Sequence, residues 1–110
     1  MNYLHKNLAH GQWFKFNFFE QMANIGSEIE RTISWRKKNN EKMSKMAFER
    51  GLELLDITIA DIKNRQRLKE LCRTREVLAD YFWFDNEYKS TDELWQKYFY
   101  AFNWAARRDK

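Results

Sequence analysis

Two carboxylates one helical turn apart are the residues in this sequence whose spacing comes nearest to metal chemistry. Glu53 and Asp56 form an E-x-x-D pair, and carboxylates at this separation on a helix can reach the same Mg²⁺ ion. A complete site needs further carboxylates from a neighbouring helix. The candidates there, Glu28 and Glu30, point to different sides and form no E-x-x-E pair. We therefore interpret Glu53 and Asp56 as part of a solvated acidic face.

Other catalytic signatures are missing from the sequence. It has no glycine-rich phosphate loop, no H-E-x-x-H motif and no cysteine pair for zinc. Helical RNases of the HEPN type need a histidine shortly after an arginine, but His5 and His10 both precede every arginine. We expect no enzyme activity, no cofactor and no bound metal. The alternative is a MazG-like nucleotide pyrophosphohydrolase, which holds Mg²⁺ with carboxylate pairs on neighbouring helices.

A basic stretch is the strongest indication of a binding function. Between Lys63 and Arg75 the sequence has six basic residues against one acidic residue, Glu70. Three of them are four residues apart, so they share one helix face over about 12 Å and could follow a phosphate backbone. The alternative is an ordinary solvated face. We expect phosphate contacts from this row and from the basic ends of two other helices: Arg65, Lys69, Arg73, Arg36, Lys37, Lys38, Arg107 and Arg108.

Arg75 differs from these cations because it falls within an apolar arc that includes Leu71 and Leu78. A charge in such a position is costly unless a carboxylate pairs with it. We predict a structural ion pair between Arg75 and Glu28 that fixes the register of two helices.

Aromatic residues make up 17% of the chain, and several lie away from the predicted core stripes. Trp and Tyr are enriched at protein interfaces, so we expect self-association through Trp35, Trp83, Tyr100 and Trp104. An N-terminal arm with Trp13, Phe14 and Phe16 could clasp a neighbouring copy. The alternative is that the arm folds over its own chain.

Hydrophobic periodicity predicts the first two helices. Asn17 and Glu20 have the spacing of a capping box, and apolar residues follow at helical steps until a basic segment begins at Arg36. A second helix is predicted from about Glu41 to Ile62. Its apolar face covers nearly half of the circumference, which indicates a central position or a second chain. Gly51 on this face suggests a close helix crossing.

Two further helices follow. The third is predicted from about Arg65 to Phe84, with Leu68, Leu71, Cys72, Leu78, Ala79 and Phe82 inward. The fourth is predicted from about Thr91 to Arg107, after a second capping-box spacing at Ser90 and Glu93. Its inward residues are expected to be Leu94, Trp95, Tyr98, Phe102 and Ala105.

Composition agrees with one all-α domain. The 110 residues include no proline and three glycines, which is poor for a sheet with many turns. Short loops favour an antiparallel up-down-up-down four-helix bundle over residues 17–110, after an aromatic arm at residues 1–16. The single cysteine, Cys72, and the lack of a long apolar run indicate a cytoplasmic protein that does not enter the membrane. The net charge of +4 is compatible with a nucleic-acid partner.

Three segments carry a resemblance to a known family: residues 24–28 (Asn-Ile-Gly-Ser-Glu), residues 50–56 (Arg-Gly-Leu-Glu-Leu-Leu-Asp) and residues 67–78, which start Arg-Leu-Lys-Glu-Leu and end Arg-Glu-Val-Leu. The chain resembles the accessory variability determinant (Avd-like) proteins of diversity-generating retroelements and related small basic four-helix bundles. The resemblance implies a homopentamer that binds a reverse transcriptase and its template RNA.

The sequence thus predicts a non-enzymatic, oligomeric helical accessory protein. It would bind RNA or DNA, a nucleic-acid enzyme such as a reverse transcriptase, or both. A helical partner protein of the toxin–antitoxin type is a further alternative.

Overall fold

In the computed structural model, residues 11–108 are described, and within this range the fold is entirely helical. The prediction of an all-α fold is therefore confirmed. A short 3-10 segment, η2 (Trp13–Lys15), precedes the first helix, and another, η3 (Ile62–Arg67), precedes the third. The α-helices of this range are α1 (Phe18–Lys37), α2 (Glu41–Ala60), α3 (Leu68–Trp83) and α4 (Asp92–Arg108).

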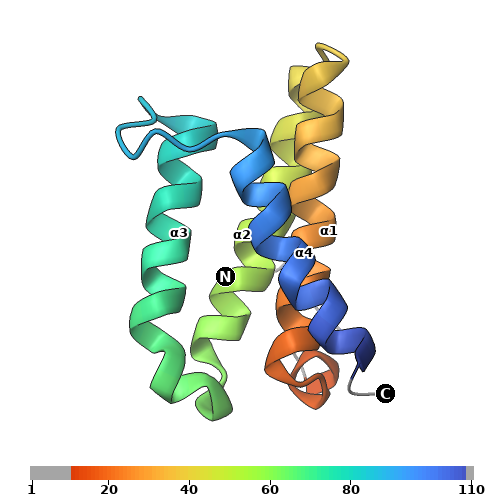
Figure 1. The fold of residues 1–110 in the computed structure, drawn as a ribbon, viewed down its shortest axis with the longest axis vertical. Coiled ribbons are helices and arrows are strands. Elements are labelled where there is room, and N and C mark those ends of the chain that lie inside the picture. The colour runs from red at the N-terminus through yellow and green to blue at the C-terminus, as the bar shows by residue number, and fades with distance from the viewer. Residues whose placement is uncertain (1–10, 109–110) are drawn as a thin grey trace.

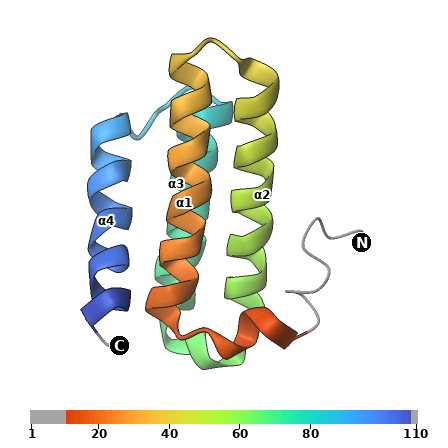
Figure 2. The same ribbon diagram turned by 90° about the vertical axis from the view of Figure 1, so that its right-hand side faces the viewer.

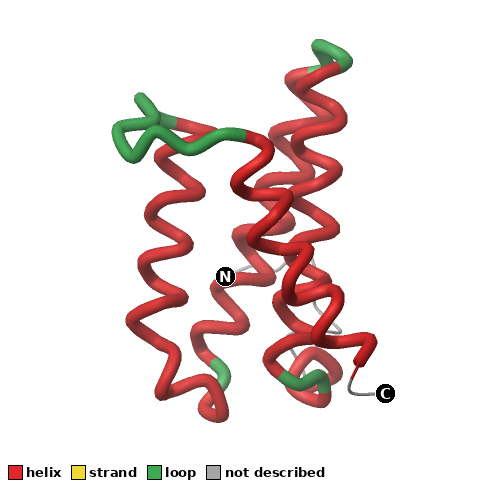
Figure 3. Tube along the Cα trace, viewed as in Figure 1, coloured by secondary structure: helices red, strands yellow, loops and turns green. Residues whose placement is uncertain are grey.

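The four helices pack side by side, and α1 lies against both α2 and α4 (Figures 1 and 2). The turn between α1 and α2 lies at the top of Figure 1, as does the loop between α3 and α4, whereas η3 lies at the bottom. Figure 3 shows that loops are confined to the ends of the described helices. α3 packs mainly against α2 and η3. α4 is therefore held mostly by α1, and no other described helix covers its opposite side.

Local sequence signals set the beginnings of the helices. The capping box predicted before α1 is confirmed, because Asn17 Oδ1 accepts from the Glu20 amide at 2.8 Å and the Asn17 amide donates to Glu20 Oε1 at 3.1 Å. The cap of α4 lies one residue later than predicted. Thr91 Oγ1, not Ser90, accepts from the Leu94 amide, while the Ser90 amide donates to Asn86.

The main boundary error concerns the junction between α2 and α3. The second helix ends at Ala60 and not at Ile62, and the third begins at Leu68 and not at Arg65, because η3 occupies the interval. Asp61 ends α2 with an extended backbone and accepts from the Lys63 amide. Ile62, the predicted last residue of the second helix, is 81% exposed.

The core forms along the inner faces of the helices. The α1 stripe is buried as predicted, with Met22 and Ile25 fully enclosed. The α4 stripe is partly wrong, because Leu94 is 57% exposed and Phe99 is buried. On α3, Leu68 and Cys72 are likewise exposed. The buried apolar residues are Trp13, Phe18, Met22, Ile25, Ile29, Ile33, Ala47, Phe48, Leu52, Leu54, Leu55, Ile57, Leu71, Leu78, Ala79, Trp95, Phe99 and Ala106.

The segment before α1 folds onto its own chain. Trp13 is buried, and its indole Nε1 donates to Thr58 Oγ1 on α2 at 2.9 Å. Trp13 thus belongs to the core, so it does not extend toward a second copy. Residues 1–10 of the predicted arm, with His5 and His10, lie outside the described range.

A buried polar cluster joins this segment to the end of α2 and to the first half of η3. The Gln21 side-chain amide donates to Asp61 Oδ2 at 2.9 Å and to the Trp13 carbonyl at 3.3 Å. Asn64 donates in turn to Gln21 Oε1 at 2.8 Å and to the Thr58 carbonyl at 3.0 Å. We call Trp13, Gln21, Thr58, Asp61 and Asn64 the polar cluster. Since these side chains are buried, each hydrogen bond also avoids the cost of an unsatisfied polar group.

Gly26 sets the distance between α1 and α4. A Cβ placed on Gly26 would lie 2.7 Å from Phe99 Cβ, an atom close to the α4 backbone. On Gly51 it would lie 3.4 Å from Glu28 Cβ, an ordinary contact. Of these two glycines, Gly26 and not Gly51 therefore lies where two helices approach each other more closely.

We predict that Gly26→Ala forces α1 and α4 apart and lowers the free energy of unfolding by about 1–3 kcal/mol. The matched control is Gly51→Ala, for which better helix propensity offsets a mild contact, and we expect stability within about 1 kcal/mol of the wild type. Urea unfolding followed by circular dichroism measures both. Equal stability of the two variants would contradict the close crossing.

The pH dependence of stability tests the polar cluster. Burial tends to raise the pKa of Asp61, but the hydrogen bonds from Lys63 and Gln21 outweigh it and lower the pKa below its ordinary value of 3.8. A carboxylate with a lowered folded-state pKa stabilises the fold above its unfolded-state pKa and loses that contribution as the pH falls. We expect Asp61→Asn to cost about 1–3 kcal/mol at neutral pH and less near pH 3. A difference between wild type and variant that does not shrink on acidification would contradict this role of Asp61.

Candidate nucleic-acid interface and exposed aromatic surface

The predicted basic row on the third helix is only partly formed. Arg65 lies in η3 and Lys69 and Arg73 lie on α3, so the change of helix type interrupts a row that was expected to be continuous. All three side chains are exposed. Arg73 contacts Glu76 at 3.6 Å and lies over the Tyr88 ring at 4.5 Å. Among residues 11–108, neither Arg65 nor Lys69 has a carboxylate within ion-pair distance.

Arg36 joins three helices. Its Nη2 donates to Asp92 Oδ1 at 2.6 Å and to the Tyr81 hydroxyl at 2.8 Å, and its guanidinium lies 4.8 Å from the centre of the Tyr81 ring. Burial, followed by the hydrogen bond to Asp92, raises the pKa of Tyr81. Arg36 therefore fixes α1 against α3 and α4. Lys37 and Lys38, the next two residues, are exposed.

The structure does not gather the predicted phosphate contacts on one surface. Lys37 and Lys38 adjoin the α1–α2 turn, which lies at the top of Figure 1, whereas Arg107 and Arg108 belong to the last turn of α4, the end of the helix that lies toward the bottom. Arg65 also lies toward the bottom, in η3. Both arginines of α4 are exposed, and Arg108 lies over the Trp104 ring at 5.0 Å.

The predicted ion pair between Arg75 and Glu28 is wrong. Arg75 donates to both carboxylate oxygens of Asp56, at 2.6 and 3.3 Å, and this hydrogen bonding raises the pKa of Arg75. Glu28 is buried and accepts from Arg31 and, at 3.0 Å, from Arg50. Arg75 and Glu28 are thus both paired, but not with each other. Arg75 thus joins α3 to α2, while Glu28 joins α1 to α2.

The acidic pair is also engaged in structure. Asp56 is held by Arg75, so one carboxylate of the E-x-x-D motif faces a cation of the protein. Within the described range, no group of three histidine, cysteine, aspartate or glutamate side chains could hold a metal ion.

The four predicted interface aromatics lie in different environments. Trp83, at the end of α3, is 44% exposed and packs edge-on against Phe48 at 4.9 Å. Trp35 is half-buried, with Lys38 over its ring at 5.1 Å. Tyr100 and Trp104 are 66% and 53% exposed and share the outer face of α4. Only this last pair forms a common surface.

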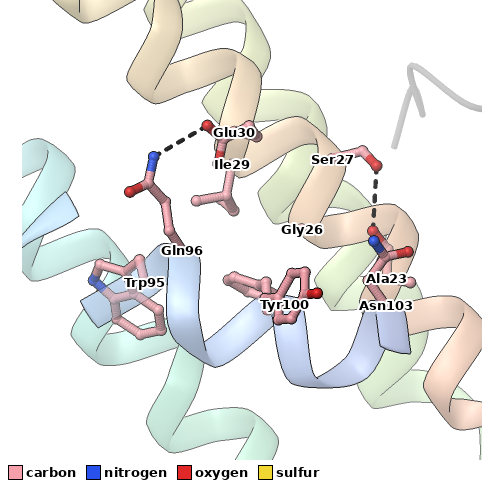
Figure 4. Close-up of a pocket in the computed structure, with 10 residues that line it drawn as sticks. Ala23, Gly26, Ser27, Ile29, Glu30, Trp95, Gln96, Tyr100 and Asn103 are labelled. Carbon is pink, nitrogen blue, oxygen red and sulfur yellow. Dashed lines mark hydrogen bonds between the residues drawn. The ribbon is translucent and has the colours of Figure 1, made fainter. Parts of the chain in front are cut away.

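A groove of about 200 Å³ runs between α1 and α4. Figure 4 shows its floor of small residues on α1, with Tyr100 and Asn103 along the opposite side. Gln96 closes one end by donating to Glu30 Oε1 at 3.1 Å. Trp95 also lines the groove, and its buried Nε1 has no hydrogen-bond partner among the described residues.

Sequence reasoning missed the polar cluster and the Arg36–Tyr81–Asp92 contact. Neither has a motif, because each joins residues more than ten positions apart in the sequence. No described helix is sufficiently long and apolar to cross a membrane. Comparison with protein-family models, curated proteins and solved structures finds no match for this chain.

Proposed function

We propose that this chain is a non-enzymatic helical accessory protein that associates with itself and binds nucleic acid. The observation that supports the proposal best is the contrast between two groups of cations. Arg36, Arg50 and Arg75 join helices, and each has a carboxylate partner. Arg65 and Lys69 are exposed and, within residues 11–108, have none. Cations without a structural partner are the ones free to contact phosphate.

The proposed contact uses the outer side of η3 and α3. Lys69 and Arg73 are one helical turn apart, and Arg65 lies at the adjoining end. Such a surface contacts phosphates without reading bases, so it binds with little sequence preference. Only a few phosphates are neutralised, so the affinity should be modest, and because the contacts are electrostatic it should fall as the salt concentration rises.

The partner could also be an enzyme that acts on nucleic acid. A reverse transcriptase is the partner that the family resemblance suggests, with template RNA bound alongside. The exposed thiol of Cys72 fits a reducing compartment, and we place this function in the cytoplasm.

Fluorescence anisotropy with labelled RNA and DNA oligonucleotides tests the proposal. If three cations each neutralise one phosphate, the logarithm of the binding constant should fall with the logarithm of salt concentration with a slope of about −2 to −3. We expect the Arg65→Glu/Lys69→Glu double variant to weaken binding by about tenfold at low salt, since it replaces attraction with repulsion.

The control for this experiment is Glu substitution of two exposed lysines on α2, Lys42→Glu/Lys45→Glu, which makes the same change in net charge. It should weaken binding much less. An equal loss in both double variants would show that net charge alone is responsible. No binding by the wild type at low salt would refute the proposal.

A further inference from the structure

The outer face of α4 has an unusual combination of exposed residues. Successive residues of a helix are 100° apart, and the exposed positions of α4 from Glu93 onward fall on one side, opposite the buried Trp95, Phe99 and Ala106. Figures 1 and 2 show that no described helix covers this side. The face consists of Glu93, Leu94, Lys97, Tyr100, Ala101, Trp104, Arg107 and Arg108.

This face is apolar at its middle. Tyr100 and Trp104 are 66% and 53% exposed, and Leu94, at the edge of the face toward α3, is 57% exposed, although large apolar side chains are usually protected from water. Aromatic residues grouped in this way are typical of the centre of a protein interface.

The two ends of the face carry opposite charges, with Lys97 between them. Glu93 lies in the first turn of α4, and Arg107 and Arg108 lie in the last turn. Two such faces in parallel would bring like charges together at both ends. In antiparallel orientation, each acidic end meets a basic end, so the face is complementary to itself about a two-fold axis.

We propose that two copies of this chain pair through antiparallel α4 helices that cross near Tyr100. In this register Glu93 of each copy faces Arg107 and Arg108 of the other, because these positions are nearly equidistant from Tyr100 in the sequence. Lys97 then faces Trp104 of the other copy, where a cation–π contact forms. The groove between α1 and α4 lies beside Tyr100 and offers a recess for an aromatic ring of the second copy.

This pairing specifies the self-association in the proposed function and leaves the cations of η3 and α3 uncovered. It differs from the pentamer that the family resemblance implies, since a two-fold interface closes with two copies. It also requires no nucleic acid, so failure of pairing and failure of nucleic-acid binding are separate outcomes.

Sedimentation velocity of the full chain, without nucleic acid, tests the pairing. We expect the wild type to form dimers, and Glu93→Arg or the Arg107→Glu/Arg108→Glu double variant to raise the dimer dissociation constant by about tenfold or more. A chain that carries all three substitutions again has opposite charges across the interface, so it should recover most of the dimer affinity. Trp104→Gln, at an exposed site, should weaken the dimer while its circular dichroism stays that of the wild type.

The charge-matched controls are Glu49→Arg and Lys42→Glu/Lys45→Glu on exposed positions of α2, and both should leave the dimer unchanged. A monomeric wild type would overturn the proposal. So would an oligomer of any size that the α4 variants leave unchanged, or a combined variant that dimerises no better than the single reversals.

Discussion

Burial of Gln21 is the constraint on which the end of the bundle that contains η3 depends. The side chain is fully enclosed, so its amide must find partners inside the protein. It finds them in the Trp13 carbonyl, the Asp61 carboxylate and the Asn64 amide, which come from three different segments. Satisfying this one side chain fixes the entry to α1, the end of α2 and the geometry of η3.

A second contact shapes the other side of the bundle. Gly26 lets Phe99 approach the α1 backbone closely, and α4 therefore buries one narrow face against α1. α3 contributes little to this packing. Large rings such as Trp95 and Tyr98 lie on the side of α4 toward α3, where Tyr98 meets Thr74 at 3.1 Å. The aromatic residues left on the outer face belong to a helix that has one close neighbour, α1, among the described helices.

The parts of the fold that depend on nearby residues could be predicted from the sequence. The cap at Asn17 and the stripe through Met22 and Ile25 follow from local spacing. The α4 stripe was misplaced because aromatic residues occur on every side of that helix, so residue type does not reveal the buried face. The prediction of Glu28 as the partner of Arg75 was wrong because ion pairing depends on the rotation of α2 about its axis, which no local signal sets. η3 was not predicted for the same reason, because its formation depends on buried contacts of Asp61 and Asn64 that no local signal reveals.

We propose that two chains pair through α4 while the cations of η3 and α3 remain available for phosphate. Native mass spectrometry of the full chain with a short RNA measures both properties in the same ions. We expect a species of two chains that carries RNA at low ionic strength and releases it, still as two chains, when the ionic strength is raised. A single chain without RNA under both conditions would contradict it.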